Sequence, residues 1–297
     1  MGVFWGLDTM INMSSVPLLL AAAVVLIMSN LQGLHVNMLS DYEIDKKYKK
    51  ILPGAIDTLG KKLFKAIFLA ECMVAFLLVL LLTLFLGKII LAVLWLIGFL
   101  IGLAYSLEPL RFKSNPMLNP ISLVLVLCLL PMVWVYYIFA SSMTPAFGLF
   151  CLGIAFGVIG LVLPTELEDF PEDRVAEVRN PTQVLGPLRA SEFSICATVA
   201  SVSIASIGAG LGFLDTNVHW LWIPATLVMV IAHSFVVWKL LVLRKICSQY
   251  ENAKISERDG YMKRIKRITN ESPRWFGLVA CSGIFAGFLL YLSRILI

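Results

Sequence analysis

Residues 64–107 read FKAIFLAECMVAFLLVLLLTLFLGKIILAVLWLIGFLIGLAYSL. Two long apolar runs, 64–86 and 89–107, meet here at a turn at Lys88. A helix needs roughly 20 apolar residues to cross a bilayer core. Only a helix satisfies its own backbone hydrogen bonds in lipid, and these runs do not alternate as barrel strands do. Each run is therefore predicted to be a transmembrane helix.

The rest of the chain has the same character. Of its 297 residues, 59% are hydrophobic and 14% are charged, and the mean hydropathy is +0.88. A soluble domain usually has about 25% charged residues, so a water-soluble fold is excluded. We expect one all-α, multi-pass domain over 1–297 with about eight membrane helices, six of them in further apolar runs at 16–36, 118–140, 145–164, 193–213, 219–243 and 276–296.

The basic residues indicate the topology of this bundle. The net charge is +5, but Lys and Arg are spread over loops and form no single patch, so no nucleic acid is expected as a partner. The positive-inside rule places basic loops in the cytoplasm, with both termini outside a cell membrane. With eight helices, the four large basic loops share one face: 41–63, 108–117, 165–192 and 244–275.

A first acid motif, 37–45, follows the first apolar run. If the helix continues past the lipid, Asn37, Asp41 and Asp45 form one narrow stripe, because residues four apart differ by about 40° around the axis. Stacked carboxylates repel each other unless a cation lies between them. The alternative is a solvated helix end whose acids are balanced by Lys46 and Lys47.

A second acid motif, 166–173, follows the fifth run. Glu166, Asp169 and Asp173 are spaced to share a helix face, whereas Glu168 and Glu172 are expected to point elsewhere. Such a density of acids near an anionic membrane surface is costly without compensation. Mg²⁺ is the expected occupant, since one or two carboxylates commonly bind it together with phosphate oxygens.

A basic loop, 105–113, lies between the two acid motifs in sequence. Arg111 and Lys113 stand where a helix meets the cytoplasm. They are predicted to neutralise a diphosphate, Arg as a bidentate fork and Lys as a point charge. The alternative is that both are loop cations that only set the topology.

Together these three segments resemble the UbiA-type intramembrane prenyltransferase superfamily. That family has an NDxxDxxxD motif, a YSxxPxRxK-like loop and a DxEDxxGDxxxG motif followed by a Thr-containing stretch that ends in Leu-Gly. The matching residues here are Asn37, Asp41 and Asp45 in the first motif, Tyr105, Ser106, Pro109, Arg111 and Lys113 in the loop, Glu168, Asp169 and Asp173 in the second motif, and Thr182, Leu185 and Gly186 after it.

The sequence also departs from the family pattern. Met38 replaces the Asp that directly follows the first Asn in the family, Glu166 replaces the first acid of the second motif, and Glu172 replaces a small residue. Members usually have nine spans, with a whole helix before the one that carries the first motif, and we expect that helix to be lacking here. Metal binding is expected to survive these changes, whereas recognition of an acceptor is left open.

The resemblance implies a site and a reaction. Asp41, Asp45, Asp169 and Asp173 would be the catalytic carboxylates, and with Glu166 they would hold Mg²⁺. The predicted diphosphate-binding residues are Asn37, Tyr105, Arg111 and Lys113. The implied reaction moves a prenyl chain from a prenyl diphosphate to a hydrophobic or aromatic acceptor or a lipid precursor, in a central cavity open to the cytoplasm and surrounded by membrane lipid.

Two other functions remain open. One is a membrane terpene cyclase on the same scaffold, in which the substrate's own double bond captures the cation. The other is a non-enzymatic transporter or scaffold, whose acids only solvate the loops.

Three polar residues inside apolar runs are further candidates. Glu71 is a functional candidate because ionisable groups in membrane helices are rare, although Lys65 is close enough to pair with it. His233 is interpreted as a packing residue. Asn30 lies seven residues before Asn37, so it is expected to face the same cavity.

Overall fold

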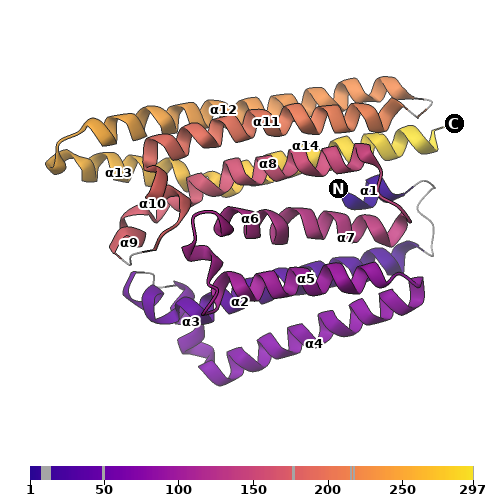
Figure 1. Ribbon diagram of the computed structural model, residues 1–297, viewed down its shortest axis with the longest axis horizontal. Coiled ribbons are helices and arrows are strands. Elements are labelled where there is room, and N and C mark those ends of the chain that lie inside the picture. The colour runs from indigo at the N-terminus through magenta and orange to yellow at the C-terminus, as the bar shows by residue number, and fades with distance from the viewer. Residues whose placement is uncertain (8–14, 49–50, 176–177, 215, 217, 297) are drawn as a thin grey trace.

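The computed structural model describes residues 1–7, 15–48, 51–175, 178–214, 216 and 218–296, and all regular secondary structure among them is helical (Figure 1). Eight helical segments are long and apolar enough to cross a membrane, which confirms the predicted number. They are Ser15–Glu43, Lys61–Leu86, Ile89–Ser106, Leu118–Phe139, Pro145–Glu168, Pro187–Leu214, His219–Asn252 and Ile255–Ile295.

The helices follow one another along the chain with short connections. Their bounds are α1 Gly2–Gly6, α2 Ser15–Tyr48, α3 Ile51–Leu59, α4 Lys61–Leu86, α5 Ile89–Ser106, η1 Phe112–Ser114, α6 Leu118–Val124, η2 Leu125–Leu129, α7 Leu130–Phe139, α8 Pro145–Glu168, α9 Phe170–Val175, α10 Pro181–Leu185, α11 Pro187–Leu214, η3 His219–Leu221, α12 Trp222–Asn252, α13 Ile255–Thr269 and α14 Ser272–Ile295.

The turn between α4 and α5 shows how the sequence ends its helices. Gly87 adopts a left-handed conformation, with φ of 65°, directly after α4. Glycine takes this conformation at little steric cost and is common after helix ends. The next residue, Lys88, donates from Nζ to the carbonyl oxygens of Tyr137 (2.9 Å) and Ala140 (2.9 Å) at the end of α7. This short turn therefore ends α4 through Gly87 and caps the last carbonyl groups of α7 through Lys88.

Close packing of α8 against α11 forms the centre of one half of the bundle. A Cβ on Gly153 of α8 would lie 2.3 Å from the backbone N of Ala205, and one on Gly208 of α11 would lie 2.4 Å from that of Phe150. Small residues let helix backbones approach closely in membranes, where van der Waals packing drives association. In Figure 1, α12 and α14 complete this half, and α2, α4, α5 and α7 form the other.

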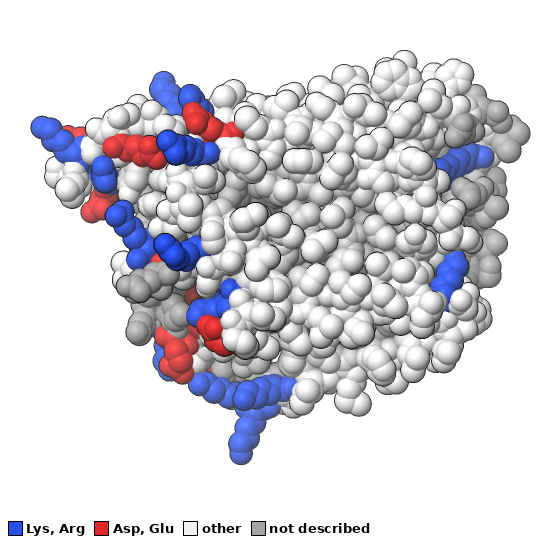
Figure 2. Space-filling model, viewed as in Figure 1, with Lys and Arg blue, Asp and Glu red and all other residues white. Residues whose placement is uncertain are grey.

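Charged residues gather at one end of the bundle. In Figure 2 most red and blue side chains lie at the end where Figure 1 places α3, α9, α10 and α13, and few lie elsewhere on the visible face. This agrees with the prediction that the large charged loops share one face. The cytoplasmic orientation of that face stays a prediction.

The short helix α1 precedes α2 in the described chain and packs inside the bundle, between α7 and α14 (Figure 1). Trp5 is 2% exposed, and its ring lies 4.9 Å from that of Phe150, between centroids. Arg294 Nη1 donates to the carbonyl oxygens of Trp5 (3.0 Å) and Leu7 (3.3 Å). The start of the chain is thus anchored at the end opposite the large charged loops.

Two buried polar residues have partners on neighbouring helices. Glu71 pairs with His35 of α2 (Oε2 to Nδ1, 2.8 Å), so the suggestion that it pairs with Lys65 is wrong. Glu71 has this partner because α4 packs against α2, and the sequence does not show which helices come into contact. His233 Nδ1 donates to the carbonyl oxygen of Met229 (2.8 Å), and its Nε2 bonds Ser201 (3.1 Å). Both ring nitrogens of His233 are therefore used in packing, as predicted.

Candidate active site

A polar pocket of about 290 Å³ lies at the charged end of the bundle. All nine predicted site residues line it, so the structure brings together segments that are far apart in the sequence. Its lining residues are Asn37, Asp41, Asp45, Tyr105, Arg111, Lys113, Ser114, Asn119, Leu123, Val162, Thr165, Glu166, Asp169, Glu172, Asp173, Val178 and Asn180.

The first acid motif lies on one continuous helix. Because α2 runs to Tyr48, Asn37 and Asp41 stay on one face, and the basic loop closes over them. Lys113 Nζ lies 2.5 Å from Asp41 Oδ1 and 3.1 Å from Asn37 Oδ1. Arg111 Nη2 lies 3.5 Å from the same Asp41 oxygen. The two loop cations therefore compensate the first acid motif directly.

Contacts with α3 hold the end of α2. The hydroxyl of Tyr42 donates to Asp57, which holds the pKa of that carboxyl below its usual value. Lys46 Nζ donates to the Tyr42 hydroxyl (3.2 Å) and lies 3.6 Å from Asp57. Lys46 is thus engaged with α3, and the side chain of Lys47 lies outside the described residues. Tyr42 and Asp57 fix the helix turn that carries Asp41.

The second acid motif crosses a break between two helices. α8 ends at Glu168, Asp169 has φ of −91° and ψ of 6°, and α9 begins at Phe170, so the continuous helix face assumed from the spacing does not exist. Glu166, Asp169 and Asp173 nevertheless line the polar pocket. The break thus places the three acids on two different helices and the residue between them, but all three side chains still line the same pocket.

Glu172 corrects another prediction. It was expected to point away from the other acids, yet it lines the pocket, where Lys266 of α13 contacts it at 2.5 Å. The helix break at Asp169 accounts for the difference, because it rotates α9 away from the direction of α8. Lys266 is more than 90 residues away in sequence, and pairing at that distance leaves no local pattern.

Asn180 is a site residue that the sequence reasoning missed. Its Nδ2 donates to Asp173 Oδ2 (2.7 Å), while its Oδ1 accepts from the backbone N of Gln183 (3.0 Å) and caps α10. It is only 3% exposed. The pair Asn180-Pro181 carried the signal, since Asn at the cap followed by Pro is typical of a helix start.

Glu166 is the most unusual acid of the pocket. Both of its carboxylate oxygens are buried, and neither accepts a hydrogen bond of ordinary geometry from the described residues. Nearby on the pocket wall, the buried Oδ1 of Asn119 also has no such partner, while its Nδ2 donates to the carbonyl oxygen of Lys113 (3.1 Å). A buried polar group without a hydrogen bond is costly, so these oxygens indicate a place for a ligand or a cation.

The charge balance of the pocket also indicates a place for a cation. Six carboxylates line it against two cations, an excess of four negative charges if all the acids are ionised. Burial lowers the pKa of the Lys113 ammonium, and the hydrogen bond that Lys113 donates to Asp41 opposes that shift. Among the described residues, no three His, Cys, Asp or Glu side chains converge to hold a metal alone. An anionic ligand needs accompanying cations to bind here.

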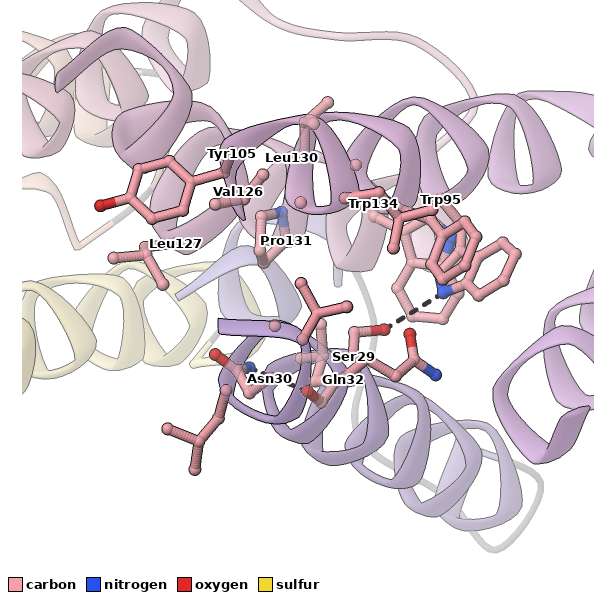
Figure 3. Close-up of a pocket in the computed structure, with 18 of the residues that line it drawn as sticks. Ser29, Asn30, Gln32, Trp95, Tyr105, Val126, Leu127, Leu130, Pro131 and Trp134 are labelled. Carbon is pink, nitrogen blue, oxygen red and sulfur yellow. Dashed lines mark hydrogen bonds between the residues drawn. The ribbon is translucent and has the colours of Figure 1, made fainter. Parts of the chain in front are cut away.

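An apolar chamber of about 420 Å³ adjoins the polar pocket (Figure 3). The two cavities share Asn37, Tyr105 and Leu123, and the chamber extends from there between α2, α5 and α7. Asn30 lines it, as expected from its position on α2. The combined cavity therefore has a charged end at the surface of the bundle and an apolar end inside it.

Fold and site define a class: a helical, multi-pass membrane protein with a cavity that is charged at one end and apolar at the other. The chain belongs to the UbiA prenyltransferase family, whose family model matches residues 2–253. This confirms the predicted family. No curated protein matches the sequence.

Solved structures of a UbiA homolog from Archaeoglobus fulgidus share the fold. The one bound to DMAPP and Mg²⁺ has a TM-score of 0.60 at 16% identity, over 94% of this chain and 93% of that one. The one bound to GPP and Mg²⁺ has a TM-score of 0.57 at 15% identity, over 88% of each chain. At this identity the likeness establishes the fold alone.

Proposed function

We propose that this protein is a Mg²⁺-dependent intramembrane prenyltransferase, which moves an isoprenoid chain from a prenyl diphosphate to a hydrophobic or aromatic acceptor. The observation that carries the proposal is the joined cavity, whose polar pocket holds six carboxylates with Arg111 and Lys113, and whose other end is apolar. The ligands named for the Archaeoglobus fulgidus homolog, DMAPP and GPP with Mg²⁺, support it.

The residues present fit Mg²⁺. The pocket offers oxygen donors, which hard cations prefer, and the unpaired oxygens of Glu166 lie among them. Asp41 and Asp45 would hold the ions from one wall, and Glu166, Asp169 and Asp173 from the other. When bound together with the diphosphate, the ions would supply electrostatic stabilisation of the leaving group.

The chain's own residues would bind and orient the diphosphate. Lys113 and Arg111, which contact Asp41, would turn part of their donor capacity toward phosphate oxygens. Asn37 and Tyr105 stand at the junction of the two cavities, where the diphosphate meets the prenyl chain. As the carbon–oxygen bond breaks, positive groups aimed at the departing oxygens stabilise the developing charge.

The apolar chamber would hold the prenyl tail and exclude water. A carbocation that forms at the junction must meet the acceptor before it meets water, so an apolar wall is part of the chemistry. By the positive-inside rule, the polar pocket would open to the cytoplasm and both termini would lie outside. The acceptor's identity does not follow from these residues, and a terpene cyclase is the second candidate, because the same cavity would serve a substrate that captures its own cation.

The decisive experiment incubates purified protein with a panel of prenyl diphosphates and Mg²⁺, with and without membrane lipid extract, and measures diphosphate release and product mass. We expect magnesium-dependent release that needs the extract and yields a prenylated acceptor. A terpene hydrocarbon or alcohol formed without extract would establish the cyclase. Absence of magnesium-dependent release with every substrate, in protein that remains folded, would refute both enzymes and leave a transporter or scaffold.

A further inference from the structure

We propose that Trp95 and Trp134 close the apolar chamber and limit the prenyl chain to about three isoprene units. This inference rests on the proposed function, because it names the class of prenyl diphosphate that the same cavity selects. It concerns the end of the chamber away from the polar pocket. Figure 3 shows both indole rings at one end of the chamber, and Tyr105, which also lines the polar pocket, at the other.

Hydrogen bonds fix both tryptophans in place. Trp134 Nε1 donates to the carbonyl oxygen of Leu91 (2.9 Å), and Trp134 is 3% exposed. Trp95 Nε1 donates to Ser29 Oγ (3.1 Å), and its ring stacks on that of Phe99 at an interplanar angle of 9°. Trp134 is buried and Trp95 half-buried, and an indole that has satisfied its N–H and packed its ring does not rotate away at low cost. The two rings therefore form a rigid end wall.

The position of this end wall sets the length of prenyl chain that the chamber can hold. Trp95 and Tyr105 both lie on α5, ten residues apart, which at about 1.5 Å per residue is about 15 Å. An extended chain covers about 3.5 Å over three backbone bonds, so the four chain bonds of an isoprene unit cover about 4.5 Å. About three units thus fit between the junction and the wall. A fourth unit would have to displace a tryptophan or leave the chamber sideways.

Glycines keep the chamber open along its length. Gly98 and Gly102 of α5 line it between Tyr105 and Trp95. A Cβ on Gly102 would meet no atom within 4 Å, and one on Gly98 would meet only Leu130 Cδ1, at 3.4 Å. A larger side chain at Gly102 would therefore enter empty space, so it shortens the chamber without a backbone clash.

The test measures affinity, by competition binding and thermal stabilisation, for dimethylallyl, geranyl, farnesyl, geranylgeranyl and octaprenyl diphosphates with Mg²⁺. The wild type should prefer farnesyl diphosphate and bind the two longer substrates weaker by on the order of tenfold. Trp134→Leu should move the preference to geranylgeranyl diphosphate. Gly102→Leu should move it to dimethylallyl diphosphate, and this variant keeps the inference testable if Trp134→Leu does not fold.

Trp238→Leu is the matched control, because Trp238 is 55% exposed and does not line the chamber. It should keep the wild-type order of affinities. Equal affinity of the wild type for farnesyl and octaprenyl diphosphates, or an unchanged order in Gly102→Leu, overturns the length limit while leaving the proposed function intact. Failure of the wild type to bind any prenyl diphosphate overturns the proposed function itself.

Discussion

The two acid motifs stand on the same polar pocket but are held in different ways. The first lies on the unbroken helix α2, and its Asp41 receives both Lys113 and Arg111. The second crosses the break at Asp169, and its Glu166 has two buried oxygens with no hydrogen-bond partner among the described residues. The chain's own cations therefore compensate Asp41, whereas the carboxylate oxygens of Glu166 have no ion pair or ordinary hydrogen bond among the described residues.

This difference has an energetic meaning. Removing one partner of a buried pair leaves the other charge uncompensated, which is strongly destabilising. Removing a buried charge that has no partner relieves a desolvation cost. Neutralising Asp41 and neutralising Glu166 should therefore change stability in opposite directions, although each change should lower activity.

The largest effect is expected for the central acids. Asp41→Asn and Asp173→Asn should each reduce magnesium-dependent diphosphate release by on the order of a thousandfold, because each removes a carboxylate that faces the leaving group. Thermal unfolding should show a clear loss of stability for Asp41→Asn, which leaves Lys113 without its carboxylate. Glu192→Gln, in an exposed pair with Arg244, is the control and should behave as the wild type. Near-normal turnover in either Asp variant would remove these residues from the site.

Glu166→Gln should lower activity and raise stability. Loss of one predicted metal ligand should cost on the order of a hundredfold in diphosphate release at limiting Mg²⁺. Replacing this buried carboxyl, which is costly to ionise in its buried position, by a neutral amide should increase the free energy of unfolding by about 1 kcal/mol in metal-free protein. Magnesium titration of activity and calorimetry in chelator check both parts. A Glu166→Gln variant that is less stable than the wild type without metal would contradict the conclusion that Glu166 is uncompensated.

Substitutions of Lys113 test the pairing that compensates Asp41. Lys113→Met should weaken diphosphate binding about tenfold to a hundredfold, since hydrogen bonds to charged groups contribute about 1.5–3 kcal/mol. Because burial lowers the pKa of Lys113, its positive charge is complete at low pH and is lost at a lower pH than for an ordinary lysine. Wild-type affinity for pyrophosphate with Mg²⁺ should therefore fall as the pH rises into the alkaline range.

Lys113→Arg is the matched variant for this pH profile. Arginine stays protonated throughout the accessible range, so the alkaline fall should disappear even if the affinity at neutral pH is lower. An unchanged alkaline fall in Lys113→Arg would assign the titration to another group.

The smallest effect is expected at Asn180, which positions Asp173 and caps α10. Asn180→Ala should reduce kcat about tenfold with little change in KM, and lose about 1 kcal/mol of stability with the cap. Asn180→Ser keeps a capping oxygen but lacks the amide donor to Asp173. The Ser variant should therefore recover stability and keep the low kcat. Recovery of kcat together with stability would mean that Asn180 only caps the helix.

The sequence by itself determined the membrane class, the eight spans found among the described residues, and nine of the residues that line the polar pocket. Apolar runs of bilayer length leave the backbone no alternative to helices, and hydropathy is a local property of the chain. The nine predicted site residues could be named for a related reason: carboxylates and cations at helix ends stand out against an apolar background, and their order along the chain carries the family resemblance.

Only the tertiary structure decided how those residues are paired. Lys113 with Asp41, Lys266 with Glu172 and Glu71 with His35 join different helices, and no local spacing encodes such contacts. The helix break at Asp169 and the end wall of Trp95 and Trp134 likewise depend on where α8, α5 and α7 pack. A side chain's type follows from the sequence, whereas its partner and its burial are set by which helices come to lie against each other.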